Sequence, residues 1–360
     1  MSLNNVSSRY RSGALDLLRF LAVLIVYFGH YADSFNYFYH IVPENLKYHP
    51  VTKYGNVALL IFFTVSGYVV TMTSIKRNSR EFWISRVSRI YPLFWISCIV
   101  AFLLPRFVPE HTLLSVSSFK TFLANLTMFP SLIGYQMINP IFHTLLAELI
   151  FYTFIGIIIA FRLWNKVLFI ILGLTIYCLF YTFSLEKSLN VLIPPYLLGM
   201  IFYLIKAKYD KPWKLYSLMA LNCICLVSIS RILTHDLDLF YSIQNAANFW
   251  VMLTLIISAY LFIYLIAIEK IRIKSTKVSF ILGQITYPFY LFHIYFFYIY
   301  WYFRDSVQSD LLLFGLLFLI LIISWLLHKF IELKMAAVFS QILISIWNIF
   351  SKPDLKKDSF

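Results

Sequence analysis

The stretch Leu15–His30 reads LDLLRFLAVLIVYFGH, an apolar run with Arg19 near one end and His30 at the other. In a helix, a separation of eleven residues brings a side chain back to within about 20° of its starting direction, so Arg19 and His30 share one face. They lie about 16 Å apart along the helix axis, a large part of the hydrocarbon thickness of a bilayer. Because ionisable side chains are costly in lipid, this face is predicted to border a polar path through a helix bundle.

The composition excludes a soluble fold. Of 360 residues, 61% are hydrophobic and 13% are charged, and the mean hydropathy is +0.78. A soluble domain would lack the polar side chains needed to cover its surface, whereas long, repeated apolar runs are typical of membrane helices. The sequence therefore predicts an all-α, polytopic integral membrane bundle of about ten transmembrane helices.

The apolar runs set the expected organisation of the chain. Two shorter apolar stretches differ from the full spans: Phe119–Ile133 is expected to be interfacial or re-entrant, and Met335–Phe350 to lie at the membrane surface. We expect one transmembrane domain over residues 1–334, and an interfacial segment with a cytoplasmic tail over 335–360. The predicted spans are 14–34, 55–74, 89–108, 139–161, 166–184, 189–206, 213–233, 246–268, 278–302 and 310–329.

The basic residues set the expected orientation. With the N-terminus inside, 23 of the 30 Lys and Arg residues fall on the cytoplasmic side, so both termini are expected there, N-in and C-in. The net charge of +14 follows this topology, and membrane lipids rather than nucleic acid are the expected partner. The four cysteines lie in apolar runs without disulfide or zinc spacing, so we expect no metal site.

Glu148 lies well inside the predicted span 139–161, with Tyr152 one helical turn further on. An unpaired carboxylate in this setting costs several kcal/mol. A contact between Glu148 and His30 is geometrically possible, and a histidine oriented by a carboxylate can activate a hydroxyl nucleophile. The alternatives are structural: an interhelical hydrogen bond for Glu148, a lipid-phosphate contact for Arg19, and an interfacial position for His30.

Two further segments carry polar residues inside apolar runs. Ser66 and Gly67 fall in the middle of the second span, where serine usually bonds its own backbone and glycine usually permits close helix packing. The segment Gly283–His293 reads GQITYPFYLFH, and its proline is expected to kink the helix. Its polar residues, Tyr287, Tyr290 and His293 among them, either line a cavity or bond the backbone groups that the kink frees.

The densest cationic segment is Lys76–Arg89, KRNSREFWISRVSR. Arg86 and Arg89 are spaced i, i+3, so in a helix they form one patch at the inner end of the third span. Planar guanidinium groups suit phosphate oxygens. The ordinary alternative is that the segment sets topology and contacts anionic lipid headgroups.

Taken together, these residues resemble the acyltransferase-3 family of membrane-bound bacterial O-acyltransferases that modify cell-surface glycans. Each short motif is weak alone, but the motifs follow the family's order from residue 14 to about 334. They are Arg-x10-His at Arg19 and His30, FFTVSGY at Phe62–Tyr68, Arg-x-x-Arg with Ile-Tyr-Pro at Arg86–Pro92, Glu-x-x-Phe-Tyr at Glu148–Tyr152, Tyr-x-x-Tyr-Leu-x-His at Tyr287–His293, and Phe-Ile-Glu at Phe330–Glu332.

The resemblance implies an enzyme of the bacterial inner membrane. Such proteins take an acyl group, usually acetyl, from cytoplasmic acetyl-CoA, which is a substrate rather than a tightly bound cofactor. They deliver it to a hydroxyl of a surface glycan or lipid-linked oligosaccharide, for which lipopolysaccharide O-antigen is the leading expectation here.

On this basis each candidate residue has an expected role. Arg86 and Arg89 would hold the phosphates of the donor, helped by Lys76, Arg77 and Arg19. His30, oriented by Glu148, would deprotonate the acceptor hydroxyl and later protonate the leaving thiolate; Arg19 completes the catalytic set. The candidates for oxyanion or substrate contact are Ser66, Tyr152, Tyr287 and His293. An acyl-His30 intermediate is an open variant.

Two other classes remain open at this stage. A transporter or carrier of a lipid-linked sugar or small metabolite would also have buried charges and a polar path, but inverted repeats expected of many such proteins are not evident. A non-catalytic partner in a glycan-synthesis complex would tolerate substitution of Arg19, His30 and Glu148.

Overall fold

The computed structural model describes residues 12–39, 54–107, 114, 116–183, 189–241, 247–303 and 306–350. Every regular element in these ranges is helical, with single 3-10 turns between several of the longer helices. The main helices are α2 (Gly13–Tyr39), α4 (Asn56–Ser74), α5 (Ser79–Phe107), α7 (Phe142–Ala160), α8 (Val167–Phe183), α9 (Ile193–Lys206), α10 (Pro212–Tyr241), α11 (Phe249–Ala267), α12 (Lys277–Phe292), α14 (Ser309–Leu326) and α15 (Leu333–Phe350).

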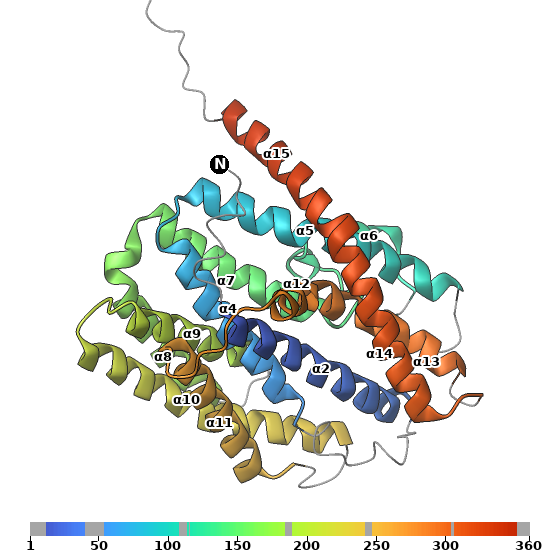
Figure 1. The fold of residues 1–360 in the computed structure, drawn as a ribbon, viewed down its shortest axis with the longest axis horizontal. Coiled ribbons are helices and arrows are strands. Elements are labelled where there is room, and N and C mark those ends of the chain that lie inside the picture. Colours follow the sequence, from blue (N-terminus) through green and yellow to red (C-terminus); the bar gives the residue numbers. More distant parts are fainter. Residues whose placement is uncertain are drawn as a thin grey trace, which may run out of the picture.

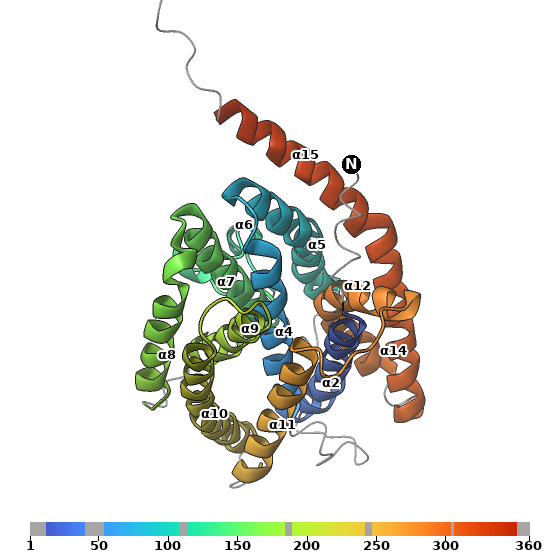
Figure 2. The same cartoon turned by 60° about the vertical axis from the view of Figure 1, so that its left-hand side comes forward.

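The predicted polytopic all-helical bundle is confirmed. Within the described ranges, nine helical stretches are long and apolar enough to cross a membrane, and α9 is a shorter apolar helix. These correspond to the ten predicted spans, and Figures 1 and 2 show them gathered around α2 and α4. The expected N-in, C-in orientation stays a prediction, and its terminal parts, residues 1–11 and 351–360, lie outside the described residues.

Two differences between the helix bounds and the predicted spans bear on the polar residues, one at α5 and one at α14. The third predicted span begins at residue 89, whereas α5 begins at Ser79. The side chain of Asn78 accepts a hydrogen bond from the Glu81 backbone N–H at 2.8 Å, which satisfies a free donor in the first turn of α5. Most of the cationic segment is therefore part of a helix, so its side chains have fixed directions along α5.

The C-terminal apolar stretch continues a long helix. A π-helical turn, Leu327–Glu332, joins α14 to α15 without a break, so the helix continues past residue 329, where the last predicted span ends. α15 runs along α5 (Figure 1): the rings of Trp95 and Phe339 are 5.2 Å apart, and Arg80 donates a 2.7 Å hydrogen bond to Asn348. The stretch Phe119–Ile133, predicted to be interfacial or re-entrant, contains the short helix α6 (Phe119–Leu126) and a 3-10 turn.

α4 and α9 pack closely on each other. A Cβ atom on Gly199 would lie 2.7 Å from the backbone N of Tyr68, and one on Gly67 would lie 3.0 Å from Cα of Tyr196. No side chain fits at either position, so the two backbones pack directly on each other, as small residues allow in membrane helices. The expectation that Gly67 serves close packing is confirmed.

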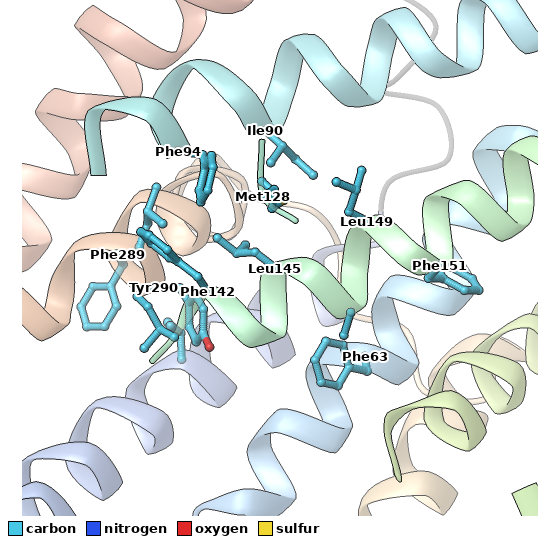
Figure 3. Packing of buried hydrophobic residues seen from close by; sticks show 14 of the residues in the cluster. Phe63, Ile90, Phe94, Met128, Phe142, Leu145, Leu149, Phe151, Phe289 and Tyr290 are labelled. Carbon is cyan, nitrogen blue, oxygen red and sulfur yellow. The ribbon is translucent and has the colours of Figure 1, made fainter. Parts of the chain in front are cut away.

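A large aromatic and aliphatic core fixes the helices that carry the polar residues. Figure 3 shows buried side chains of α4, α5, α7 and α12 meeting around Phe63, Phe94, Phe142, Leu145 and Phe289. Dense packing of this kind keeps side chains in single rotamers. α2 lies against both α4 and α12, so its Arg19–His30 face is held against this core.

Candidate active site

Two histidines face each other where α2 meets the end of α12. His30 is on α2, and His293 begins the 3-10 turn His293–Phe296 that follows α12. His30 Nδ1 lies 2.8 Å from His293 Nε2, and the rings are stacked with centroids 5.1 Å apart. The fold therefore pairs two imidazoles that lie 263 residues apart in the sequence.

Hydrogen bonding assigns the protons of this pair. His293 Nδ1 lies 2.6 Å from the carbonyl oxygen of Tyr290, which can only accept, so His293 Nδ1 carries the proton. In a neutral His293 the Nε2 atom is then an acceptor, and His30 Nδ1 must donate to it. This assignment leaves Nε2 of a neutral His30 with a free lone pair. The pair is thus arranged to present one basic nitrogen.

Glu148 on α7 is the centre of a second polar group. Its Oε1 accepts a hydrogen bond from the hydroxyl of Tyr152, one turn along the helix, and lies 3.5 Å from Ser66 Oγ on α4. Arg19 and Arg89 interact electrostatically with the same carboxylate. Opposite charges and hydroxyl donors thus compensate the partial burial of the carboxylate.

Three guanidinium groups, those of Arg19, Arg86 and Arg89, gather around Glu148. Arg86 is only 5% exposed; its Nη2 donates to Thr73 Oγ1 at 2.5 Å, and its Cζ lies 5.1 Å from the centroid of the Tyr152 ring. The Nε atoms of Arg86 and Arg19 are buried and have no acceptor among the described residues. Leaving a buried charged donor unpaired is costly, so this arrangement is typical of a site whose acceptors come from a ligand.

The structure corrects one predicted contact. His30 was expected to meet Glu148, but its hydrogen-bond partner is His293, and no hydrogen bond joins His30 to Glu148 among the described residues. The reason is the helix register: Glu148 interacts electrostatically with Arg19, which lies about 16 Å along α2 from His30. The catalytic roles assigned to His30, Glu148 and Arg19 stay predictions.

Tyr290 lies between the two groups. Its ring centroid is 5.6 Å from that of His293, and its hydroxyl interacts electrostatically with Glu148. The hydroxyl also lies 2.6 Å from Thr144 Oγ1. Because Thr144 Oγ1 donates to the carbonyl of Ile141, Tyr290 is the donor in this bond. The polar side chain of Tyr290 is therefore close to the histidine pair and within electrostatic reach of Glu148.

The other predicted donor-binding residues lie at the edge of the arginine cluster. Lys76 is exposed in the short link between α4 and α5. Arg77 donates a 2.7 Å hydrogen bond to Ser85 and interacts electrostatically with Arg86. The link therefore places additional positive charge next to the arginine cluster.

The candidate hydroxyl donors differ in how firmly they are already bonded. Tyr152 donates to Glu148, and Tyr287 donates to the carbonyl of Ile90 at 2.8 Å. Ser66 was expected to bond its own helix, but its Oγ lies 3.5 Å from Glu148, at the outer limit of a hydrogen bond. Ser66 is therefore the easiest of the three to redirect toward a ligand.

Two residues near the site were missed by the sequence analysis. Thr73 is the hydrogen-bond acceptor for Arg86, and nothing in the sequence marks it. His328 pairs with Glu332 at 2.8 Å in the π-helical turn. The i, i+4 spacing of a histidine and a glutamate in an apolar run is a signal that would have found this second pair.

The fold and the site define a class: a multi-pass helical membrane protein with a histidine pair and an arginine–carboxylate cluster in its interior. A family model for an acyltransferase domain matches residues 12–329. The chain belongs to the acyltransferase-3 family, and it is a membrane acyltransferase. The matched range contains both polar groups and ends before Glu332. No curated protein and no solved structure matches the chain.

Proposed function

We propose that this acyltransferase moves an acetyl group from cytoplasmic acetyl-CoA to a hydroxyl of a surface polysaccharide, such as lipopolysaccharide O-antigen, at the bacterial inner membrane. The observation that carries the proposal is the presence on α2 of both polar groups, with Arg19 in the arginine cluster and His30 in the histidine pair. The arginine cluster suits an anionic acyl donor, and the histidine pair offers a base.

The arginine cluster is proposed to bind the diphosphate end of coenzyme A. Arg86 and Arg19 have buried Nε donors without acceptors among the described residues, and Arg89 is exposed. Guanidinium groups match phosphate oxygens in charge and geometry. Lys76 and Arg77 would add positive charge where acetyl-CoA enters from the cytoplasm.

The histidine pair is proposed to perform the chemistry. His30 Nε2 takes the proton of the acceptor hydroxyl while the oxygen attacks the thioester carbonyl carbon. The tetrahedral intermediate then collapses, the C–S bond breaks, and the thiolate takes the proton back from His30. General acid–base catalysis of this kind contributes about 10²–10⁴-fold to the rate. His293 holds His30 in the tautomer that this step requires, a part first expected of Glu148.

The negative oxygen of the tetrahedral intermediate needs a hydrogen-bond donor. Removing one such donor typically costs about 10²–10³-fold in rate. Ser66 is the proposed donor because its present bond to Glu148 is long. Tyr152 and Tyr287 would have to give up shorter bonds to serve the same purpose.

Replacing His293 tests the assignment of the tautomer. His293→Ala removes the acceptor of His30 Nδ1–H, so the basic nitrogen is no longer fixed, and the transfer rate is expected to fall by about 10²-fold. His293→Gln offers a side-chain oxygen as an acceptor and is expected to retain more activity than His293→Ala. Initial rates of acetyl transfer by the purified variants measure this order. Equal rates for both variants and the wild type would refute it.

The proposed reaction is tested by following the acetyl group. Membranes containing the protein are supplied with radiolabelled acetyl-CoA, and surface glycan is then isolated and analysed by mass spectrometry. Label in the glycan and a mass increase of about 42 Da, the mass of acetyl replacing hydrogen, are expected only when the protein is present. Glycan without label, with acetyl-CoA unconsumed, would overturn the proposed donor and acceptor.

A further inference from the structure

The π-helical turn Leu327–Glu332 holds a second pair of titratable side chains. His328 Nδ1 lies 2.8 Å from Glu332 Oε2, and both residues are more than nine-tenths buried. Single π-helical turns inside long helices occur frequently at functional sites. Neither residue takes part in the chemistry proposed above, and Glu332 lies beyond the range of the family match.

The turn packs on α5 and α12, the helices that carry Arg89 and Tyr287. Both of these residues interact electrostatically with Glu332. The hydroxyl of Tyr287 already donates to a backbone carbonyl of α5. Lys329, in the same turn, lies over two aromatic rings of its own helix, 4.7 and 5.0 Å from their centroids. Glu332 can therefore act on the active site through its electrostatic interaction with Arg89.

Arg89 interacts electrostatically with two carboxylates, Glu332 in the π-helical turn and Glu148 on α7. No hydrogen bond from its guanidinium is found in the part of the chain that the structure describes, and Arg89 is exposed as a residue. A long, unbonded side chain takes its direction from the surrounding charges. Loss of one carboxylate would draw the guanidinium to the other, since the attraction between opposite charges rises as their separation falls.

We propose that Glu332, held in place by His328, is a positioning residue that keeps Arg89 away from Glu148 and open to the phosphates of the donor. This inference rests on the proposed function, because it assigns Arg89 to donor binding. Without the negative charge of Glu332, Arg89 pairs with Glu148, and the donor must break that ion pair before it binds. Glu332 thus acts on donor affinity through Arg89.

Binding of coenzyme A to the purified full-length protein tests this inference. Glu332→Gln keeps the size of the side chain and removes its charge, and it is expected to raise the Kd for coenzyme A about tenfold. Glu332→Asp keeps the charge and is expected to restore most of the affinity. The control is Glu269→Gln: Glu269 pairs with Lys206 and Arg272 on the surface, and its loss is expected to leave the Kd unchanged.

A double-mutant cycle separates positioning from a general structural effect. In an Arg89→Gln background, Glu332→Gln is expected to cause no further loss of affinity, because the residue through which it acts is absent. Equal losses in both backgrounds, or an unchanged Kd for Glu332→Gln, would overturn the inference. Failure of the wild type to bind coenzyme A would instead refute the proposed donor.

If Glu332→Gln does not fold, His328→Gln provides the same test. This change weakens the support of Glu332 but keeps its charge, and a rise in Kd of about threefold is expected, again only when Arg89 is present. An unchanged Kd for His328→Gln would then overturn the inference.

Discussion

Alanine in place of His30 is expected to reduce acetyl transfer by about 10²–10⁴-fold, the range of general acid–base catalysis. His30 Nε2 is the nitrogen that the hydrogen bonds to His293 and Tyr290 leave free. Alanine removes both the base for the acceptor hydroxyl and the acid for the leaving thiolate. Acetyl transfer from labelled acetyl-CoA by the purified variant measures the loss, and the Kd for coenzyme A is expected to change little.

Two controls separate a loss of catalysis from indirect effects. His235→Ala removes an exposed histidine of α10 and is expected to leave transfer at the wild-type rate. The amount of His30→Ala in the membrane is measured beside its activity, because loss of the protein would mimic loss of catalysis. Normal transfer by a well-expressed His30→Ala variant would refute the assignment of His30 as the base.

Replacement of Arg86 by glutamine is expected to weaken binding of coenzyme A by about 10–100-fold. A hydrogen bond to a charged group contributes about 1.5–3 kcal/mol, and each 1.4 kcal/mol is a tenfold change in Kd. Arg86 is buried, and its Nε has no acceptor among the described residues. A bound phosphate would supply that acceptor at a position that water reaches poorly, so the hydrogen bond adds to affinity. Titration of the purified variant with coenzyme A gives the Kd.

The matched control is an arginine on the same helix. Arg106, in the last turn of α5, is exposed and bonds only backbone carbonyls among the described residues. Arg106→Gln is expected to bind coenzyme A as the wild type does. A similar loss in both variants would mean that charge anywhere on α5 supports binding, and an unchanged Kd for Arg86→Gln would contradict the proposed donor site.

The helices and the shared face of Arg19 and His30 could be predicted because they depend on local spacing and hydropathy. The close packing of Gly67 followed from the same kind of reasoning. The partner of His30 could not be predicted, because Glu148 and His293 are both polar residues of other helices and only the packing of α7 and α12 decides between them. Helix register brought Glu148 within electrostatic reach of Arg19, and the 3-10 turn after α12 placed His293 beside His30.

The sequence also did not predict that α14 continues into α15 without a break. Hydropathy predicts the end of the last span at residue 329 and a separate apolar stretch, Met335–Phe350, at the membrane surface. In the structure the π-helical turn carries the chain through this region and turns Glu332 inward to His328. Hydropathy alone therefore did not show that the helix continues, or that Glu332 lies in a buried pair within it.

The central claim is that one donor molecule extends from the arginine cluster to the histidine pair. It is tested most directly by an experimental structure of the protein with a coenzyme A analogue whose thioester cannot be cleaved. The account predicts the diphosphate on Arg86 and Arg89, and the carbonyl of the analogue within about 4 Å of the site where an acceptor oxygen bonded to His30 Nε2 would lie. An analogue bound with its carbonyl far from His30, or separated from it by packed side chains, would contradict the account.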